Sequence, residues 1–255
     1  MVTPRDQIAV MEQRPFVLSG GGVRGAGHIG VLKALAPRGF VPNAIAGTSA
    51  GALVGAFVAD GHAAEDLLPM LREAWNRTSF LRGPRPGSAY IEGFLRSNLR
   101  ARYFEDLKMP LHVTATDLEH GGQRIFSSGE LVPALMASCA VPLVFPPVQI
   151  EGTYYVDGGL SNNLPVEPFA DRKHEVIAVY VNPLAPFGSG KLGRFAMIDR
   201  VWHLSFREMV TRSAQGCYWF IEPPGLSAFT MFDMRKLGMA ERIGFEYAST
   251  QELPR

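Results

Sequence analysis

Ala46-Gly47-Thr48-Ser49-Ala50-Gly51 follows a short apolar run and opens an apolar segment that extends to about Ala59. This pattern predicts a strand, a sharp turn with Ser49 at its apex, and a helix. Gly47 and Gly51 leave room where the chain approaches itself, and the turn pushes the serine hydroxyl outward. The following helix would direct its free N–H groups at the same point, so Ser49 is a candidate nucleophile. G-x-S-x-G is a common pattern, and an ordinary strand-to-helix turn is the alternative.

The composition limits the classes of protein to consider. The chain has 255 residues, enough for one large domain or two small ones, and 47% of them are apolar. A formal net charge of +1 gives no reason to expect nucleic acid as the main partner. The sequence contains neither a membrane-spanning apolar run nor, in residues 1–14, the apolar core of a secretory signal. We therefore expect cytoplasmic residence, with signal-less export left open. Cys139 and Cys217 lie far apart in the sequence and are interpreted as free thiols, and a disulfide between them is the alternative.

Short apolar runs alternate with helical patterns along most of the chain. This alternation predicts an α/β fold, a three-layer α/β/α domain around a mostly parallel central sheet. Residues 1–14 are expected to form a loosely docked lead-in, and residues 15–255 a single domain. Strands are expected at 15–19, 44–46, 111–115, 123–126, 153–156 and 175–181, and helices at 26–35, 50–59, 63–75, 130–140, 194–214 and 233–252.

The segment 72–102 differs in composition from its surroundings. It contains seven arginines but only two acidic residues, Glu73 and Glu92, and aromatic residues are interleaved with the arginines. The segment is therefore a candidate lid or a surface that meets anionic lipid. A solvated helical insert whose aromatic side chains pack inward is the alternative, and we weigh it more heavily because such stretches are common on globular domains.

Gly20-Gly21-Gly22-Val23-Arg24-Gly25 separates the first expected strand from the first expected helix. It matches the dinucleotide pattern G-x-G-x-x-G, but the acidic residue that such a site needs about 20 positions later is missing. Neither this loop nor Gly188-Ser189-Gly190-Lys191 has the spacing of a P-loop. The N–H groups of Gly20, Gly21 and Gly22 can instead point at one spot and form an oxyanion hole beside a nucleophilic serine. A purely structural glycine turn is the alternative.

A nucleophilic serine needs a base. Asp157 ends an expected strand, and Gly158-Gly159 allow a tight turn beside it, at the kind of position where α/β domains carry their chemistry. His174 or His203 could complete a Ser-Asp-His order, but the first lies in a charged run and the second inside an expected helix. Asp157 is therefore the better-placed base. No metal or organic cofactor is expected, since the sequence has no acidic cluster suited to calcium and no His/Cys set suited to zinc.

Three motifs occur together in the order and rough spacing of the patatin-like phospholipase family, which they resemble over roughly residues 15–183. The residue before the glycines, Ser19, departs from the glycine or acidic residue that is frequent in the family. The motifs are the glycine loop 20–25, the pentapeptide 47–51 and Asp157-Gly158-Gly159, and further similar segments are 28–35, 116–118, 126–129, 141–142, 145–147 and 157–165.

The resemblance implies a Ser–Asp dyad without a catalytic histidine. Ser49 would attack an ester carbonyl, and Asp157 would accept the serine proton and later activate water. The glycine loop would hold the oxyanion, with Arg24 steadying the loop or meeting a phosphate. The implied function is that of a serine lipid acyl hydrolase, of the phospholipase A or lysophospholipase type, with peripheral membrane contact through 72–102 or 141–147.

Two alternatives stay open beside this implied function. One is a general carboxylesterase or thioesterase that acts on short acyl groups, and the other is a non-catalytic regulatory protein on the same fold. The resemblance leaves undetermined which lipid and which ester position would be attacked. The oligomeric state and the role of the region after about residue 185 are equally open.

Overall fold

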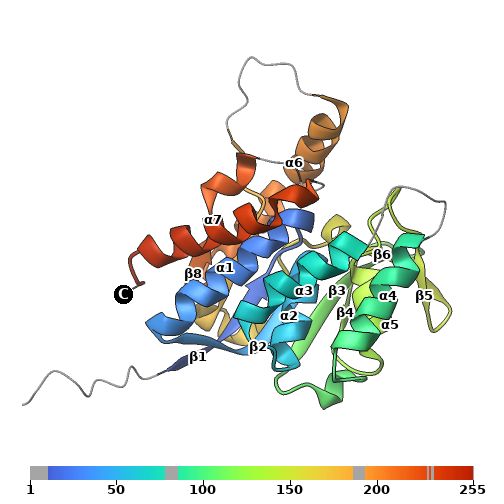
Figure 1. The fold of residues 1–255 in the computed structure, drawn as a ribbon, viewed down its shortest axis with the longest axis horizontal. Helices are drawn as coiled ribbons and strands as arrows, with labels where there is room; N and C mark the ends of the chain where they lie inside the picture. Colours follow the sequence, from blue (N-terminus) through green and yellow to red (C-terminus); the bar gives the residue numbers. More distant parts are fainter. Residues whose placement is uncertain (1–10, 78–85, 186–192, 229, 231–232, 255) are drawn as a thin grey trace, which may run out of the picture.

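The computed structural model describes residues 11–77, 86–185, 193–228, 230 and 233–254. Within these residues, an eight-stranded sheet with the order β5-β6-β3-β2-β1-β7-β8 forms the centre, and β4 pairs with β3 (Figure 1). The strands β3, β2, β1, β7 and β8 run parallel. β4 and β6 pair antiparallel with β3, and β5 pairs antiparallel with β6. The strand bounds are β1 Glu12–Leu18, β2 Phe40–Thr48, β3 Leu111–Asp117, β4 Gln123–Phe126, β5 Val148–Ile150, β6 Thr153–Asp157, β7 Ile177–Val179 and β8 Trp219–Ile221.

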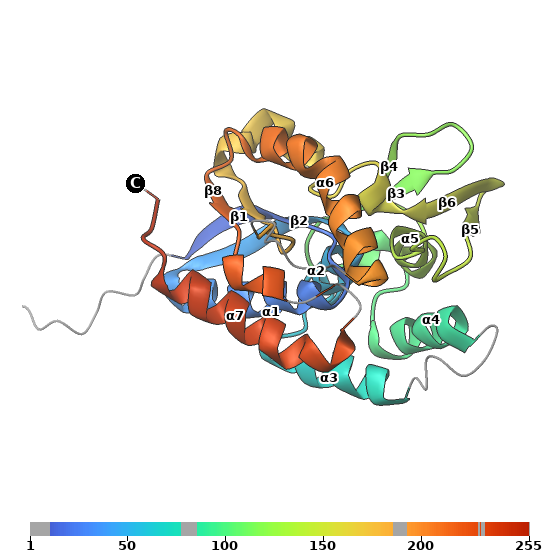
Figure 2. The same cartoon turned by 90° about the horizontal axis from the view of Figure 1, so that it is seen from above.

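Helices cover both faces of the sheet, which confirms the predicted three-layer α/β/α fold with a mostly parallel centre. Figure 2 shows α1, α3 and α7 on one side of the sheet and α6 on the other. The 3₁₀ segment Glu167–Glu175 packs on the same side as α6. The helix bounds are α1 Ala26–Leu35, α2 Ala50–Ala59, α3 Ala64–Arg77, α4 Pro86–Asn98, α5 Leu131–Ser138, α6 Arg194–Ala214 and α7 Leu237–Thr250.

Alternate side chains of the central strands pack into the two cores on either face of the sheet, because successive residues of a strand point to opposite faces. Phe16 and Leu18 of β1 pack in the large core under α1 and α2, while Val17 packs in the second core under α6. Ile177 and Val179 of β7 likewise join the first core, and Ala178 joins the second. Burial on both faces explains why these strands read as continuous apolar runs rather than as alternating ones.

β1 begins at Glu12 rather than at Pro15, so the predicted lead-in 1–14 is wrong for its last residues. Glu12 to Arg14 pair in parallel register with Phe40 to Pro42. The apolar pattern misses this part of the strand because it lies at the solvent-facing end of the sheet, where polar side chains are tolerated. Residues 1–10 lie outside the described residues.

The described part of the insert 72–102 packs inward, as predicted for a helical insert whose aromatic side chains face the core. Leu95 of α4 is buried in the main core, and the ring of Phe94 lies 5.9 Å from that of Phe57, centroid to centroid. Residues 78–85, with Phe80 and Leu81, lie outside the described residues. The lid role of the insert and the single-domain assignment of 15–255 stay predictions.

Two further sequence expectations concern the thiols and the membrane. Cys139 and Cys217 are both free thiols, as the sequence interpretation favoured, and no disulfide joins them. Among the helices of the described ranges, none combines the length and the apolar character that crossing a membrane requires.

Candidate active site

β3 brings the ends of β2 and β6 together. Thr48, the last residue of β2, pairs with Thr114 of β3, and the next residue of β3, Ala115, pairs with Asp157 at the end of β6. Ser49 follows Thr48 directly. Two predicted site residues that are far apart in the sequence, Ser49 and Asp157, therefore start from adjacent positions along one strand.

Ser49 occupies a strained turn between β2 and α2. Its backbone has φ 52° and ψ −121°, a region that residues with side chains rarely adopt. A side chain at Gly51 would overlap the carbonyl oxygens of Leu18 and Ser19, and one at Gly47 would collide with the first turn of α2. Glycine at both positions thus lets α2 begin directly against the end of β1, with the serine at the apex of the turn.

The strained turn is held by a second serine. The Ser49 N–H donates to Ser138 Oγ at 2.8 Å, and Ser138 Oγ donates to the carbonyl oxygen of Thr114 at 2.6 Å. Such a backbone conformation costs roughly 1–3 kcal/mol, and each buried hydrogen bond offsets about 1 kcal/mol of this. Ser138, near the end of α5, therefore links the turn to β3, and nothing in its sequence surroundings marks it for this role.

Asp157 is a buried carboxylate with one satisfied and one unsatisfied oxygen. Its Oδ1 accepts the N–H of Gly159 at 2.8 Å, whereas Oδ2 has no hydrogen-bond partner among the described residues. Burial raises the pKa of Asp157 to about 6, and the Ser49 hydroxyl and the Gly159 N–H counteract part of this rise. The Ser49 hydroxyl is thus near enough to stabilise the charged carboxylate, although it does not meet the geometry of a hydrogen bond to Oδ2. Such contacts are often long before substrate binds.

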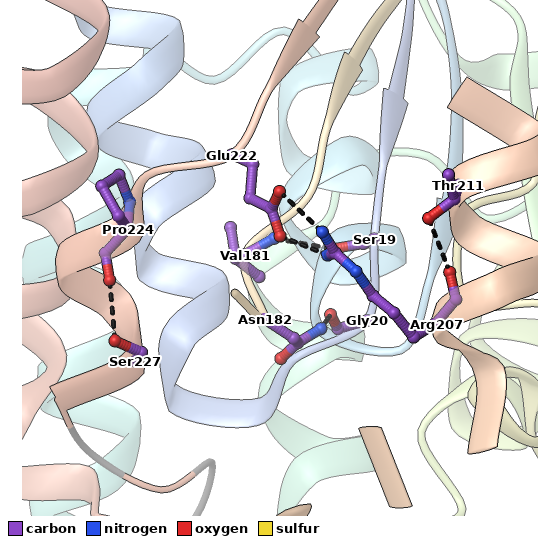
Figure 3. Close-up of polar contacts among 9 residues, drawn as sticks. All are labelled: Ser19, Gly20, Val181, Asn182, Arg207, Thr211, Glu222, Pro224 and Ser227. Carbon is purple, nitrogen blue, oxygen red and sulfur yellow. Dashed lines mark hydrogen bonds and ion pairs between the residues drawn. The ribbon is translucent and has the colours of Figure 1, made fainter. Parts of the chain in front are cut away.

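The glycine loop lies directly against the serine turn. A Cβ at Gly20 would be 3.4 Å from Cβ of Ser49. The Gly20 carbonyl oxygen accepts Nδ2 of Asn182 at 2.6 Å (Figure 3). Because C=O and N–H of a trans peptide point in opposite directions, the Gly21 N–H points away from Asn182. The N–H of Gly20, which was also predicted to face the oxyanion, donates instead to the carbonyl oxygen of Asn163 at 3.3 Å. Within the described residues, the N–H groups of Gly21 and Gly22 have no acceptor, so both are available to a ligand.

Ser19, where the sequence departs from the family pattern, joins the loop to the segment after β7. Its Oγ accepts the N–H of Val181 at 3.1 Å (Figure 3). Its own N–H donates to the carbonyl oxygen of Val179 at 3.1 Å. The hydroxyl replaces a backbone partner at the point where the ladder between β1 and β7 ends. This substitution therefore leaves the start of the glycine loop anchored.

Arg24 is buried beneath the glycine loop. Its N–H donates to the carbonyl oxygen of Gly21 at 3.1 Å, and its Nη1 donates to Oδ1 of Asn182 at 3.4 Å. The same Nη1 lies 3.4 Å from Nε2 of His203 on α6. Arginine has no acceptor, so His203 accepts through Nε2. These contacts fit the predicted role of Arg24 in steadying the loop better than the predicted phosphate contact.

The six histidines all have contacts away from Ser49 and Asp157. Burial lowers the pKa of His28 to about 4, so this side chain is neutral, and its Nε2 lies 2.8 Å from the carbonyl oxygen of Ser19. The two histidines that could have completed a triad are also engaged elsewhere, His174 beside Glu175 and His203 beside Arg24. The remaining pairs are His62 with Asp60, His112 with Phe169 and His120 with Asp117.

Cys139 and Asn182 belong to the site but were missed in the sequence. The Cys139 thiol contacts the Ser49 hydroxyl and faces Asp157, and burial raises its pKa, so it stays a protonated thiol. No sequence signal distinguishes this cysteine from an ordinary core residue. Asn182 directly follows the buried strand expected at 175–181, and the rule that α/β proteins place chemistry at carboxyl ends of strands could have found it.

The fold and the site together define the class of protein to which this chain belongs. Proteins of this class have a three-layer α/β/α domain with a serine on a strained strand-to-helix turn, a carboxylate at a neighbouring strand end and a glycine loop beside both. In the part of the chain that the structure describes, no group of three His, Cys, Asp or Glu side chains is placed to hold a metal ion. The family model described as patatin-like phospholipase matches residues 16–170, and the chain belongs to this family.

Curated relatives agree with this assignment, and a solved structure shares the fold. An uncharacterized NTE family protein of Mycobacterium tuberculosis is 35% identical over 179 residues, which are 66% of this chain and 48% of that protein. The Kluyveromyces lactis protein named lysophospholipase NTE1 is 30% identical over 176 residues, which are 64% of this chain and 12% of that protein. The chain thus spans about half the length of the mycobacterial relative and much less of the yeast one. VipD from Legionella pneumophila shares the fold, with a TM-score of 0.57 at 16% identity over 93% of this chain and 66% of VipD.

Proposed function

We propose that the protein is a serine lipid acyl hydrolase in which Ser49 is the nucleophile and Asp157 the general base. The proposal rests chiefly on one observation, the placement of the Ser49 hydroxyl beside a buried carboxylate whose Oδ2 has no partner among the described residues. Membership of the patatin-like phospholipase family and similarity to a protein named as a lysophospholipase support a lipid ester as the substrate.

The reaction follows from these positions. Ser49 Oγ attacks the ester carbonyl while its proton passes to Asp157, and the carbonyl oxygen becomes an oxyanion. The N–H groups of Gly21 and Gly22 would hold this oxyanion, and such donors are worth roughly 3–4 kcal/mol each. Protonated Asp157 then gives its proton to the departing alkoxide. In the second half-reaction Asp157 takes a proton from water, and the hydroxide attacks the acyl carbon. The bond from this carbon to Ser49 Oγ then breaks, the carboxylic acid leaves, and Asp157 returns the proton to Ser49 Oγ.

A buried environment suits Asp157 to this role. An ordinary aspartate, with a pKa near 4, is a weak base for a serine hydroxyl. Burial raises the pKa of Asp157 to about 6, which makes its carboxylate a better proton acceptor while leaving it ionised at neutral pH. Proton transfer must still be coupled to formation of the oxyanion, because free alkoxide is far more basic than any carboxylate.

A cavity next to the site is a candidate place for part of the substrate. It has a volume of about 290 Å³, and apolar residues such as Met136 and Phe145 line it together with the polar residues Ser88, Glu92 and Gln149. The carbonyl oxygen of Ala140, another lining residue, accepts the N–H of Asp157 at 3.0 Å, so the wall of the cavity is joined to the proposed base. A cavity with both apolar and polar lining suits an ester that has an apolar chain and polar groups.

The test is hydrolysis of a panel of phospholipids, lysophospholipids and soluble acyl esters of increasing chain length. The proposal predicts release of fatty acid from at least one lipid ester and activity that rises or holds as the acyl chain lengthens. Activity that falls steadily with chain length would favour the esterase alternative. Absence of hydrolysis across the panel in folded protein would favour the regulatory alternative.

The pH profile should report Asp157. Only the ionised carboxylate can accept the serine proton, so kcat/KM for a soluble ester should be constant above about pH 7 and fall on the acid side with an apparent pKa of about 6. The measurement is a rate profile between about pH 4.5 and 9 with the fold monitored by circular dichroism. The variants His203→Gln and His174→Gln should show the same decrease of kcat/KM at acid pH (the acid limb of the profile), with the same apparent pKa. An acid limb near the ordinary aspartate value, or one that disappears in either histidine variant, would contradict the assignment of the base.

Asn182→Ala should lower kcat more than it raises KM. The substitution removes the donor that holds the Gly20 carbonyl oxygen, so the Gly20–Gly21 peptide can rotate and withdraw the Gly21 N–H from the oxyanion. We expect kcat to fall about 10- to 100-fold, which is a smaller decrease than removal of an oxyanion-hole donor would cause. The pH profile should be unchanged. Asn43→Ala is a matched control, because Asn43 makes the same kind of bond, to the Gln13 carbonyl oxygen at 3.0 Å, at an exposed place. Equal kcat values for both variants would remove Asn182 from the site as a positioning residue.

A further inference from the structure

The outer surface of α6 exposes an apolar patch. Its members are spaced i, i+1, i+4 and i+7, which places them within about a third of the helix circumference. We call this set the α6 patch: Met197 is 44% exposed, Ile198 53%, Val201 57% and Leu204 51%. Scattered apolar residues are ordinary on a surface, but a contiguous group on one helix face marks an interaction site.

The opposite side of α6 already has its packing partners. Phe206 and Val210 are buried in the second core, and His203 is buried against Arg24. Further along α6 the outer surface becomes polar, with Glu208 and Arg212 paired there. The apolar character of the outer surface is therefore confined to the first half of the helix and is not needed to hold α6 to the domain.

The α6 patch is one helix diameter away from the glycine loop. His203, on the inner side of the same helix turns, lies 3.4 Å from Nη1 of Arg24, which supports that loop. A helix with its side chains is about 10 Å across. Figure 2 shows α6 on the face of the sheet opposite α1 and α7, and Figure 1 shows part of α6 extending beyond the strands. A surface that covered the patch would thus lie close to the proposed oxyanion hole.

A second group of exposed apolar side chains borders the same site. Leu143 and Val144 are exposed in the loop after α5, and the carbonyl oxygen of Ala140 at the start of this loop accepts the N–H of Asp157. Leu160, in the short 3₁₀ turn that follows Asp157, is also exposed. Exposed apolar residues therefore follow Asp157 and α5 closely in the chain, and those of α6 lie on the helix whose inner side contacts Arg24 of the glycine loop. This is the arrangement expected of a site that receives its substrate from an apolar surface.

The charge of α6 indicates which kind of surface fits. The helix carries four arginines and two acidic residues. Arg194 and Arg200 lie in the same turns as the α6 patch, together with one acidic residue, Asp199, and Nη1 of Arg200 donates to the carbonyl oxygen of Ala185 at 3.0 Å. An apolar helix face bordered by arginines is typical of helices that lie in the interface of anionic lipid membranes.

We propose that the α6 patch seats the protein on an anionic lipid surface and thereby presents that surface to Ser49. The inference deepens the proposed function, on which its catalytic consequence rests. A second copy of the chain fits less well, because a stable homodimer uses about 20 to 30 residues on each side and the patch has four. The charged border also favours phosphate groups over another apolar protein face.

The test compares three proteins, the wild type, Val201→Ser/Leu204→Ser and the control Met239→Ser/Phe245→Ser. The control removes exposed apolar side chains from α7, on the other side of the sheet. Each protein is floated with vesicles of phosphatidylcholine alone or mixed with phosphatidylglycerol. Each is then assayed on a soluble short-chain ester and on lipid in the mixed vesicles. Circular dichroism and size-exclusion chromatography report the fold and the oligomeric state.

We expect wild type and control to bind the mixed vesicles, and the α6 variant to bind about 10- to 100-fold less. Its activity on vesicle lipid should fall in parallel, with activity on the soluble ester unchanged. Equal vesicle binding by the α6 variant, no vesicle binding by the wild type, or an altered oligomeric state without a vesicle effect would overturn the inference. Patch-dependent binding by a protein that hydrolyses no ester would leave this inference standing and refute the proposed function instead.

Discussion

Ser49→Ala should abolish ester hydrolysis while leaving the protein folded. The hydroxyl is the proposed nucleophile, and removing the nucleophile of a serine hydrolase lowers kcat by about 10⁴-fold or more. The backbone of the turn is held by the Ser49 N–H, which the alanine keeps, so the thermal unfolding midpoint should stay close to that of the wild type. The measurement is initial-rate kinetics on the best ester of the panel, together with a thermal melt.

Ser227→Ala serves as the control for this substitution. The Ser227 hydroxyl donates to the Pro224 carbonyl oxygen at 2.8 Å in an exposed turn (Figure 3), so its removal deletes a serine hydroxyl whose hydrogen bond involves no proposed site residue. The control should keep wild-type kinetics. Hydrolysis by the Ser49 variant within about tenfold of the wild-type rate would show that another group is the nucleophile.

Asp157→Asn should remove activity and stabilise the fold at the same time. The amide cannot accept the serine proton, so we expect kcat to fall by about 10³-fold or more. Burial raises the pKa of Asp157 from 3.8 to about 6, which means that the folded protein favours the protonated acid. Keeping the carboxylate ionised near pH 8 therefore costs the folded state about 3 kcal/mol relative to the unfolded chain. The asparagine carries no charge and escapes this cost.

The size of this effect on stability depends on pH in a defined way. Near pH 8 the free energy of unfolding of Asp157→Asn should exceed that of the wild type by up to about 3 kcal/mol. As the pH falls from about 6 to below about 4, Asp157 becomes protonated in both the folded and the unfolded state, and the difference should vanish. Urea titrations of both proteins across this range measure it. A lower stability of the variant near pH 8 would mean that the carboxylate is stabilised rather than strained by its surroundings.

Asp117→Asn is the matched carboxylate control. Backbone N–H groups of His120 and Glu119 lower the pKa of Asp117, so its ionised form stabilises the fold and its substitution should destabilise it near neutral pH. Activity should stay unchanged. If Asp157→Asn retained hydrolysis while His203→Ala lost it, a triad with an imidazole base would replace the dyad.

The sequence predicted the three-layer fold, and it supplied the candidate residues of the site, because both depend on local patterns. Apolar runs buried on both faces of the sheet, such as 16–18 and 177–179, are recognisable without knowledge of their neighbours. The glycines at 47 and 51 are required by contacts within the turn and with the end of β1. Asp157 and its two glycines mark a strand end in the same local way.

What the sequence could not predict depends on pairing between distant segments. The placement of Thr48 and Asp157 on adjacent residues of β3 requires the strand register, which local patterns do not contain. Ser138 and Cys139 reach the serine turn from a helix that looks wholly structural in the sequence. The beginning of β1 at Glu12 was missed because polar residues at a solvent-facing strand end carry no apolar signal.

The central claim is that the hydroxyl of residue 49 is an activated nucleophile. Incubation of the folded protein with a fluorophosphonate probe, followed by mass spectrometry of the peptides, tests it directly. The account predicts one covalent adduct, on Ser49, that is absent in Ser49→Ala and forms much more slowly in Asp157→Asn. An adduct on a different residue, or an unlabelled Ser49 in protein that hydrolyses esters, would contradict it.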